Sequence, residues 1–477
     1  MTPFVVGEDL LMKIYISDSS FSYDLHSLTK AFYPLEDVEI CECESESDVF
    51  KYKAEINDLL VAEASVENKS EERAKLKNRI KRSVYKSLSD ATKTELPWGT
   101  LTGIRPTKLP MGMLREGKSE EEIISFLKNE YLVSDEKINL SIRIAKKEIG
   151  IIDSLHGNKG YSIYIGIPFC PTTCLYCSFT SNAISRWKDS VDEYISCLKK
   201  EIDYIANEFT DKVIDTVYVG GGTPTTLLPY QIDELLGYVR EKLDLSMCKE
   251  ITVEAGRPDS ITEDKLEALK RNGVTRISVN PQTMNEDTLK LIGRAHTVEQ
   301  FRDAFSLARK YFDNINTDLI LGLPGETDEK VKNTFEEITK IAPDSITVHS
   351  MAIKRAAHMD EYLKQHPEVK SEITDNMMNI QTECAKSLGM EPYYLYRQKN
   401  MTGNYENTGY STDGKEGIYN ILIMEEIQTI VALGAGSVTK RVFDDGRIER
   451  CDNVKDVKLY MEKIDEMIER KRKLFAT

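Results

Sequence analysis

Six short β-rich runs alternate with helical segments between residues 161 and 350, and this alternation constrains the fold more than any other feature of the chain. A strand, a helix and a second strand in succession predict a right-handed parallel crossover. Six such units predict an α/β fold, a partial (β/α)6 barrel of the TIM type. The predicted strands are 162–167, 216–219, 250–254, 276–279, 315–321 and 345–349. The predicted helices are 190–209, 231–243, 263–272, 298–311 and 328–341.

The chain has 477 residues, which is too long for one ordinary core and indicates further domains on either side of the barrel. We expect an N-terminal α+β domain, the barrel, and a C-terminal α/β extension that covers the substrate, over residues 1–157, 158–355 and 356–477. The segment Gly157-Asn-Lys-Gly160 is typical of such a boundary.

In the N-terminal domain, residues 12–17 and 49–56 are predicted strands, and 70–89 is a predicted helix with a basic face. That face is either a solvated surface or a docking surface for an acidic partner. The loop around Trp98 is either a cover over a site or a packed connector.

Composition excludes several classes of protein. The net charge of −16 disfavours nonspecific nucleic-acid binding. No apolar run has the length of a membrane span, and the first residues lack the basic and apolar regions of a signal peptide. Nine cysteines, an odd number, argue against a disulfide framework. We therefore expect a cytoplasmic monomer without nucleic-acid or membrane partners.

Three cysteines follow the first predicted strand in the stretch Cys170-Pro-Thr-Thr-Cys174-Leu-Tyr-Cys177. Thiolates are the ligands of iron–sulfur clusters, and a four-iron cluster held by three of them keeps one iron open. The alternatives are buried structural thiols or a zinc loop. Zinc loops pair C-x2-C units with a nearby fourth ligand, and no candidate follows before Cys197. The spacing therefore predicts a [4Fe–4S] cluster.

Other motifs follow or lie within the remaining strands, in the order Gly220–Thr223, Glu254, Gln282, Asp318 and Ala352. Because sites of such barrels gather at the carboxyl ends of the strands, we expect these residues to lie around the cysteines. A glycine triplet lets backbone approach a small charged molecule and presents amide groups, although alone it is equally a tight turn. A carboxylate inside an apolar strand, as at Asp318, is costly unless it has a partner.

The cysteine spacing, with aromatic Tyr176 before the third cysteine, resembles the radical S-adenosylmethionine (SAM) superfamily. A wider set of segments resembles the oxygen-independent coproporphyrinogen III oxidases: Tyr164–Cys170, Val219–Thr225, Val274–Gln282, Leu291–His296 and Asp318–Pro324. Further segments resemble the branch of coproporphyrinogen dehydrogenases called HemZ: Trp98–Thr107, Val348–Arg355 and Pro392–Met401.

The resemblance implies a radical SAM barrel that binds a [4Fe–4S] cluster through Cys170, Cys174 and Cys177. It implies one SAM on the cluster, in contact with Tyr164, Gly221, Glu254 and Arg294. It implies a second SAM site lined by Tyr176, Gly222, Thr223, Gln282, Asp318 and Ala352. Two departures bear on that second site. Phe179 stands where the oxidases have a fourth cysteine, and Gly166 where they have a histidine.

The implied activity is the anaerobic oxidative decarboxylation of coproporphyrinogen III to protoporphyrinogen IX, with an electron donor such as flavodoxin or ferredoxin. The rivals are a haem-binding chaperone and a radical SAM methyltransferase or haem-cleaving enzyme on the same barrel. Cations beside aromatic side chains suit the propionates of a flat tetrapyrrole. The candidates are Lys354, Arg355, Arg397 and Lys399. The tyrosines at 393–396 fit equally well as part of a buried strand.

Overall fold

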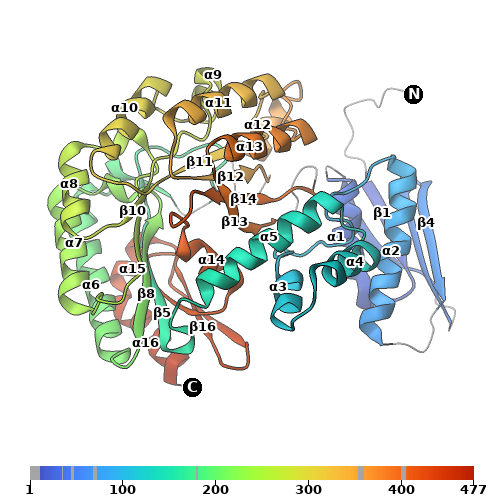
Figure 1. Ribbon diagram of the computed structural model, residues 1–477, viewed down its shortest axis with the longest axis horizontal. Helices are drawn as coiled ribbons and strands as arrows, with labels where there is room; N and C mark the ends of the chain where they lie inside the picture. The colour runs from blue at the N-terminus through green and yellow to red at the C-terminus, as the bar shows by residue number, and fades with distance from the viewer. Residues whose placement is uncertain are drawn as a thin grey trace. The chain divides into compact units, whose positions relative to one another are not determined.

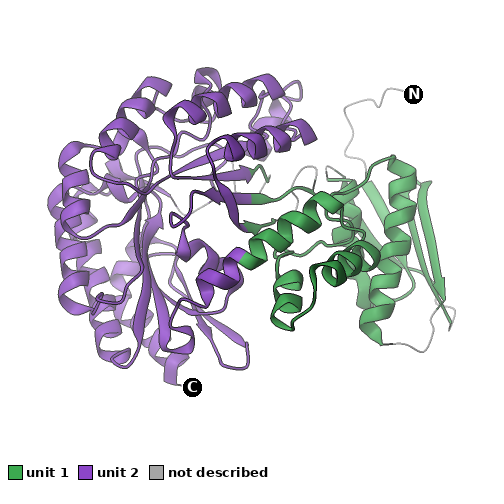
Figure 2. Ribbon diagram, viewed as in Figure 1, with its two compact units in different colours: residues 1–146, 350–352, 395–407 green, residues 147–349, 353–394, 408–477 purple. Residues whose placement is uncertain are grey.

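The computed structural model describes residues 11–34, 36–44, 48–67, 72–178, 181–352, 359–398 and 404–476. The chain forms two compact units (Figure 2). Unit 1 comprises residues 1–146, 350–352 and 395–407, and unit 2 comprises 147–349, 353–394 and 408–477. The threefold division of the sequence remains a prediction.

Unit 1 begins with a four-stranded sheet in the order β2-β1-β3-β4. Its strands are β1 (Leu11–Ile16), β2 (Asp37–Glu42), β3 (Val49–Ile56) and β4 (Leu59–Glu67). Alternate residues of β1 are buried against helices α1 (Ser22–Phe32) and α2 (Arg73–Thr92), as the period of a half-buried strand requires. The predicted strands and the basic helix of this region are confirmed.

The remaining helices of unit 1 are α3 (Lys108–Arg115), α4 (Glu120–Tyr131) and the first part of α5 (Asp135–Ile152). Trp98 is buried in their core, and its indole N–H donates to Glu406 at 2.8 Å. The Trp98 loop is therefore a packed connector within unit 1. On α2, Lys77 and Lys81 face Asp24 within salt-bridge distance, so part of the basic face is neutralised inside the unit.

Unit 2 carries an eleven-stranded sheet in the order β13-β14-β12-β11-β10-β9-β8-β5-β15-β16-β17. The six predicted strands appear consecutively within it as β5 (Gly160–Ile167), β8 (Val213–Gly221), β9 (Glu250–Glu254), β10 (Arg276–Ser278), β11 (Ile315–Leu321) and β12 (Ser345–Ser350). Neighbouring strands from β5 to β11 pair in parallel. The α/β fold predicted from the alternation is confirmed.

Helices cover the outer side of these strands (Figure 1). They are α6 (Val191–Glu208), α7 (Pro229–Lys242), α8 (Glu263–Arg271), α10 (Val298–Arg309) and α11 (Asp328–Ile341). Each turns an apolar side to the sheet, because residues three and four apart share one helix face. Shorter elements complete this part: β6 (Phe169–Cys170), β7 (Asn182–Ala183), α9 (Glu286–Leu291), α12 (Met359–Gln365) and α13 (Asp375–Ser387).

The C-terminal part of the chain extends the sheet at both edges. β13 (Glu391–Tyr396) and β14 (Asn407–Ser411) follow β12, which β14 pairs in antiparallel fashion. Tyr393 and Tyr394 are buried, so the buried-strand interpretation of residues 393–396 is confirmed. At the other edge, β15 (Thr429–Leu433) pairs in parallel with β5, and β16 (Val438–Val442) and β17 (Ile448–Asp452) follow. Helices α14 (Ile418–Glu425), α15 (Val457–Glu462) and α16 (Ile464–Ala476) complete the unit.

A buried polar cluster fastens α16 to α6. The carboxylate of Glu201 accepts hydrogen bonds from Lys471 Nζ at 2.7 Å, from the Tyr460 hydroxyl at 2.5 Å and from the Gly434 amide at 2.8 Å. Nearby, the Tyr194 hydroxyl donates to the Gly166 carbonyl and accepts from the Ala435 amide. The turn after β15 is thereby held against the carboxyl end of β5.

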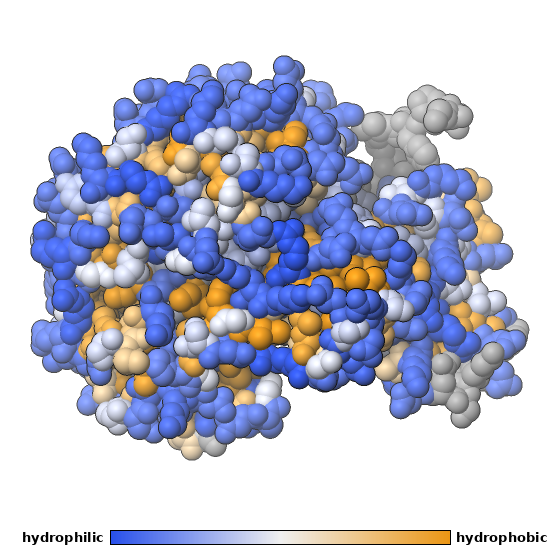
Figure 3. Space-filling model, viewed as in Figure 1, coloured by the Kyte–Doolittle hydropathy of each residue, from blue (hydrophilic) through white to orange (hydrophobic). Residues whose placement is uncertain are grey.

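The viewed surface is mostly hydrophilic, with apolar residues in scattered patches (Figure 3). Among the described residues, no helix is both long and apolar enough to cross a membrane.

Candidate functional site

The cysteine loop follows the carboxyl end of β5 and is anchored to the turn after α9. Cys170 ends β6, and the Cys177 amide donates to the Cys174 carbonyl at 3.1 Å. The Leu175 amide donates to Ile292, and the Thr172 hydroxyl donates to Gly293. Gly293 has a φ of +76°, and a Cβ there would lie 3.3 Å from the Thr173 carbonyl. The loop therefore depends on a glycine in the turn that supports it.

The three cysteines are half-buried and form no disulfide, and the sulfurs of Cys170 and Cys174 each accept a side-chain hydrogen bond. The Thr223 hydroxyl lies 3.5 Å from Cys170 Sγ, and Arg257 Nη1 lies 3.6 Å from Cys174 Sγ. In the described part of the chain, no three His, Cys, Asp or Glu side chains converge on the position of a single metal ion. Each cysteine of a cluster binds a different iron, so three thiols in one loop fit a cluster without converging on one point.

The glycine triplet at the carboxyl end of β8 lies directly against the backbone that carries the cysteines. The Gly222 amide donates to the Ile167 carbonyl at 2.8 Å, and the Thr223 amide donates to Phe169 at 2.7 Å. A Cβ at Gly222 would lie 2.6 Å from the Phe169 carbonyl oxygen. Gly221 has a φ of +108°, which favours glycine. The triplet is thus required by packing, and the amides of Gly222 and Thr223 already have acceptors within the protein.

Glu254 lies at the end of β9 beneath a stack of tyrosines. Tyr218 donates to its carboxylate at 2.6 Å, and the rings of Tyr164, Tyr218 and Tyr419 stack pairwise on one another. Burial raises the pKa of Glu254 to about 7, and the charge of Asp318 adds to this rise. Tyr218 and Tyr419 were not predicted as site residues. Tyr218 reaches the site because it lies in register with Tyr164 on the neighbouring strand.

Arg294 is buried and connects two other parts of the site. Its guanidinium donates to the Gly256 carbonyl at 3.0 Å and to the Tyr176 hydroxyl at 3.1 Å. His296 is also buried, and burial together with the charge of Arg294 lowers its pKa to about 3. This histidine is therefore neutral at physiological pH.

Gln282 and Asp318 are brought together by backbone hydrogen bonds between their segments. The Gln282 amide donates to the Asp318 carbonyl at 3.1 Å, and Gln282 has a φ of +71°. The Asp318 carboxylate accepts from Asn280 at 2.8 Å and from Asn316 at 2.6 Å. The side-chain oxygen of Gln282 is buried without a hydrogen-bond partner among the described residues. A buried oxygen in this state is where a ligand's donor would gain a hydrogen bond.

The other predicted residues are distributed as follows. Ala352 lies two residues after the end of β12 and belongs to unit 1. Arg397 also belongs to unit 1, where its buried guanidinium donates to the carbonyls of Leu101 and Asn404. Gly166 lies beside β15, and a Cβ there would be 3.2 Å from the Leu433 carbonyl oxygen, so a glycine suits this position. Four predicted or discussed residues lie outside the described part of the chain: Phe179, Lys354, Arg355 and Lys399.

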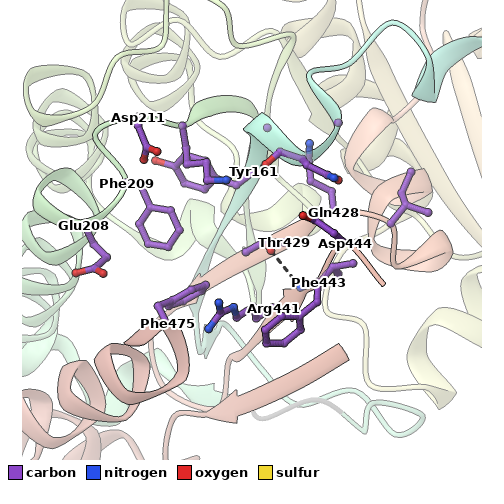
Figure 4. Close-up of a pocket in the computed structure, with 16 residues that line it drawn as sticks. Tyr161, Glu208, Phe209, Asp211, Gln428, Thr429, Arg441, Phe443, Asp444 and Phe475 are labelled. Carbon is purple, nitrogen blue, oxygen red and sulfur yellow. Dashed lines mark hydrogen bonds between the residues drawn. The ribbon is translucent and has the colours of Figure 1, made fainter. Parts of the chain in front are cut away.

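A cavity of about 360 Å³ opens near the amino end of β5, whereas the cysteine loop follows the carboxyl end of that strand (Figure 4). Tyr161 stacks on Phe209, and the Arg441 guanidinium lies over the Phe443 ring at 4.2 Å. None of the predicted site residues lines this cavity. The candidate site is therefore the region around the cysteine loop.

Comparisons with known proteins agree on the family. Residues 164–338 match the sequence model of the Radical SAM superfamily. The oxygen-independent coproporphyrinogen-III oxidase-like protein HemZ of Bacillus subtilis (strain 168) is 43% identical over 397 residues, which are 82% of this chain and 79% of that protein. The heme chaperone HemW of Lactococcus lactis subsp. lactis (strain IL1403) is 31% identical over 58% of this chain and 69% of its own.

Among solved structures, coproporphyrinogen III oxidase (HemN) from Escherichia coli superimposes with a TM-score of 0.45 and 22% identity, over 67% of this chain and 72% of that one. Members of the radical SAM superfamily bind a [4Fe–4S] cluster and SAM, and the thiols of the cysteine loop form the donor set that such a cluster needs. The chain belongs to the radical SAM superfamily and, within it, to the family of oxygen-independent coproporphyrinogen-III oxidase-like proteins that includes HemZ.

Proposed function

We propose that this protein is a radical SAM enzyme that decarboxylates two propionate side chains of coproporphyrinogen III to vinyl groups, giving protoporphyrinogen IX without oxygen. The observation that carries the proposal is the 43% identity with the oxidase-like HemZ over 82% of the chain. The cysteine loop and the residues around it support the radical chemistry.

In this proposal Cys170, Cys174 and Cys177 hold the [4Fe–4S] cluster. A bound cluster would supply one electron for the cleavage of SAM to methionine and a 5′-deoxyadenosyl radical, which would remove a hydrogen atom from the propionate. Loss of carbon dioxide and of one electron to an acceptor would then leave the vinyl group. The electron comes from a small donor protein such as flavodoxin or ferredoxin. Arg294 balances the SAM carboxylate, and Glu254 accepts from its ammonium or ribose groups. Buried side chains around the loop exclude water from the radical.

A second SAM site is part of the proposal. Gln282 offers a buried side-chain oxygen without a partner among the described residues, and Asp318 lies beside it with its carboxylate held by two asparagines. In this proposal Thr223 and Tyr176 would also line the second SAM site. Such preorganised acceptors suit the ammonium group of a SAM molecule.

Reconstituted protein, incubated anaerobically with coproporphyrinogen III, SAM and a low-potential reductant, is expected to yield protoporphyrinogen IX, carbon dioxide and 5′-deoxyadenosine. Chromatography of the oxidised porphyrins identifies the products. Rapid SAM cleavage without a decarboxylated product would contradict the proposed substrate while leaving the radical chemistry in place.

The second candidate function is that of a haem chaperone, which the 31% identity to HemW favours. Tight haem binding by the same preparation, without conversion of coproporphyrinogen, would support this alternative. An absorption titration with haem, run beside the assay above, separates the two functions.

The affinity for SAM is expected to rise with pH through the pKa of Glu254, about 7. Ionised Glu254 accepts hydrogen bonds from the ligand, and its ionised fraction falls as the pH drops below that pKa. Between pH 8 and pH 6 the dissociation constant of SAM should increase up to about tenfold, because each unit below the pKa costs a factor of ten. Equilibrium dialysis at both pH values measures this change.

Glu254→Gln should bind SAM more weakly at pH 8 and lose the pH dependence. Glu241→Gln, on the exposed side of α7, serves as the control and should keep the wild-type profile. A wild-type profile for Glu254→Gln would show that another group titrates.

A further inference from the structure

Arg257 lies beneath the cysteine loop, in the turn that follows β9. Its Nη1 atom is 3.6 Å from Cys174 Sγ, 3.1 Å from the hydroxyl of Thr172 and 3.4 Å from the Thr172 carbonyl oxygen. The residue is only 3% exposed. A cation in this position is therefore in contact with a thiol and with the loop that carries it.

The orientation of Arg257 is fixed from the side away from the sulfur. Nε and Nη2 donate to the two carboxylate oxygens of Asp259 at 3.0 and 2.9 Å, which is the bidentate geometry that an arginine fork favours. The guanidinium thus spans from Asp259 to Thr172 and Cys174. With its three nitrogens engaged and its surface buried, Arg257 is poorly placed to hold the carboxylate of a bound ligand.

Arg257 differs from two other side chains that contact the loop in the charge that it brings to a cysteine sulfur. Thr223 donates to Cys170 from a neutral hydroxyl. Arg294, the other buried arginine at the loop, donates to the Tyr176 hydroxyl and to a backbone carbonyl. Arg257, by contrast, is a cation that donates directly to a cysteine sulfur of the loop.

We propose that Arg257 is a positioning residue that raises the reduction potential of the cluster through its hydrogen bond to Cys174 Sγ. Hydrogen bonds to the sulfurs and nearby charge are two of the factors that set the potential of an iron–sulfur cluster. Reduction adds one electron to a centre that already carries the negative charge of its thiolates. A buried cation stabilises the reduced form more than the oxidised form, since Coulomb energy is weakly screened in the interior. The proposal rests on the assignment of Cys174 as a cluster ligand.

The test is an anaerobic redox titration of the reconstituted protein, followed by the electron paramagnetic resonance signal of the reduced cluster. A one-electron reductant such as dithionite supplies the electron, and neither SAM nor tetrapyrrole is present. In Arg257→Gln the equilibrium constant for reduction should fall at least tenfold, which for a one-electron couple is a shift of 59 mV to lower potential. Arg257→Lys retains the charge without the fork and should shift the potential less, in the same direction.

The matched control is Arg271→Gln. Arg271 makes the same bidentate contact to Asp233, at 3.0 and 2.7 Å, but on the exposed surface between α7 and α8. The reduction potential of the cluster in Arg271→Gln should equal that of the wild type.

Iron content and a thermal melt are measured first for each variant. If Arg257→Gln does not retain the cluster, Arg257→Lys supplies the same readout. A wild-type reduction potential in both Arg257→Gln and Arg257→Lys, each with its cluster bound, would overturn the proposal. Because no tetrapyrrole is used, that result would leave the proposed decarboxylation standing. Retention of the cluster in a Cys174→Ala variant would instead overturn the ligand assignment on which the inference rests.

Discussion

Replacing Cys174 by alanine is expected to remove the iron–sulfur cluster and abolish reductive cleavage of SAM. The residue lies in the middle of the cysteine loop, and its sulfur accepts a hydrogen bond from Arg257. Loss of an outer partner of a metal ligand already costs about 10–100-fold in metal affinity or activity, and loss of a ligand itself costs more. Two remaining thiols in the loop cannot replace the third. Iron and sulfide content, the visible absorption of the cluster and the yield of 5′-deoxyadenosine measure the effect.

Cys451→Ala is the control for this experiment. Cys451 is a free, half-buried cysteine on β17, outside the loop, so its removal should leave cluster content and SAM cleavage unchanged. A Cys174→Ala protein with a full complement of iron would show that the loop cysteines are not the ligands.

Replacing Lys471 by alanine is expected to destabilise unit 2 by about 3–5 kcal/mol, the usual effect of breaking a buried ion pair from one side. The side chains of Lys471 and Glu201 are both fully buried, and their charged atoms lie 2.7 Å apart. Without the lysine, Glu201 keeps its hydrogen bonds from Tyr460 and Gly434 but loses its neutralising charge. Urea unfolding followed by circular dichroism measures the loss.

Arg472→Ala tests whether the effect comes from burial. Arg472 is the next residue on α16 and pairs with Glu469 at the exposed surface. Exposed pairs contribute about 0–1 kcal/mol, so this variant should unfold close to the wild-type urea concentration. Equal destabilisation by both substitutions would show that the buried pair contributes no more than the exposed one.

Local patterns predicted the parallel strands well because each strand is a short buried run between turn residues. β9 and β11 begin and end where the sequence places them, at Glu250–Glu254 and Ile315–Leu321. Their side chains are buried on both faces, and such strands read as continuous apolar segments. The positions of the motifs after these strands followed from the rule that parallel strands end at one pole.

The contacts made across the fold could not be predicted in this way. Arg257 stands in an Arg-Pro-Asp turn that resembles any solvated loop, and its contact with Cys174 arises only where two strand-end loops meet. Tyr419 reaches the tyrosine stack from α14, whose sequence was compatible with either a strand or a helix. The pairing of β15 could not be predicted either, because a five-residue apolar run does not indicate which strand it will pair with.

The pairing of β15 with β5 has a consequence for how the protein is made. Chains emerge from the ribosome amino end first, and β5 is synthesised before the other ten strands of its sheet in the described part of the chain. On one side β5 finds β8 early, but its other edge stays open until Thr429–Leu433 has been translated. An open apolar edge invites pairing with other chains. Nascent or truncated chains that end before β15 would therefore be prone to aggregate, and the strand leading into the cysteine loop would gain its full set of neighbours only late in translation.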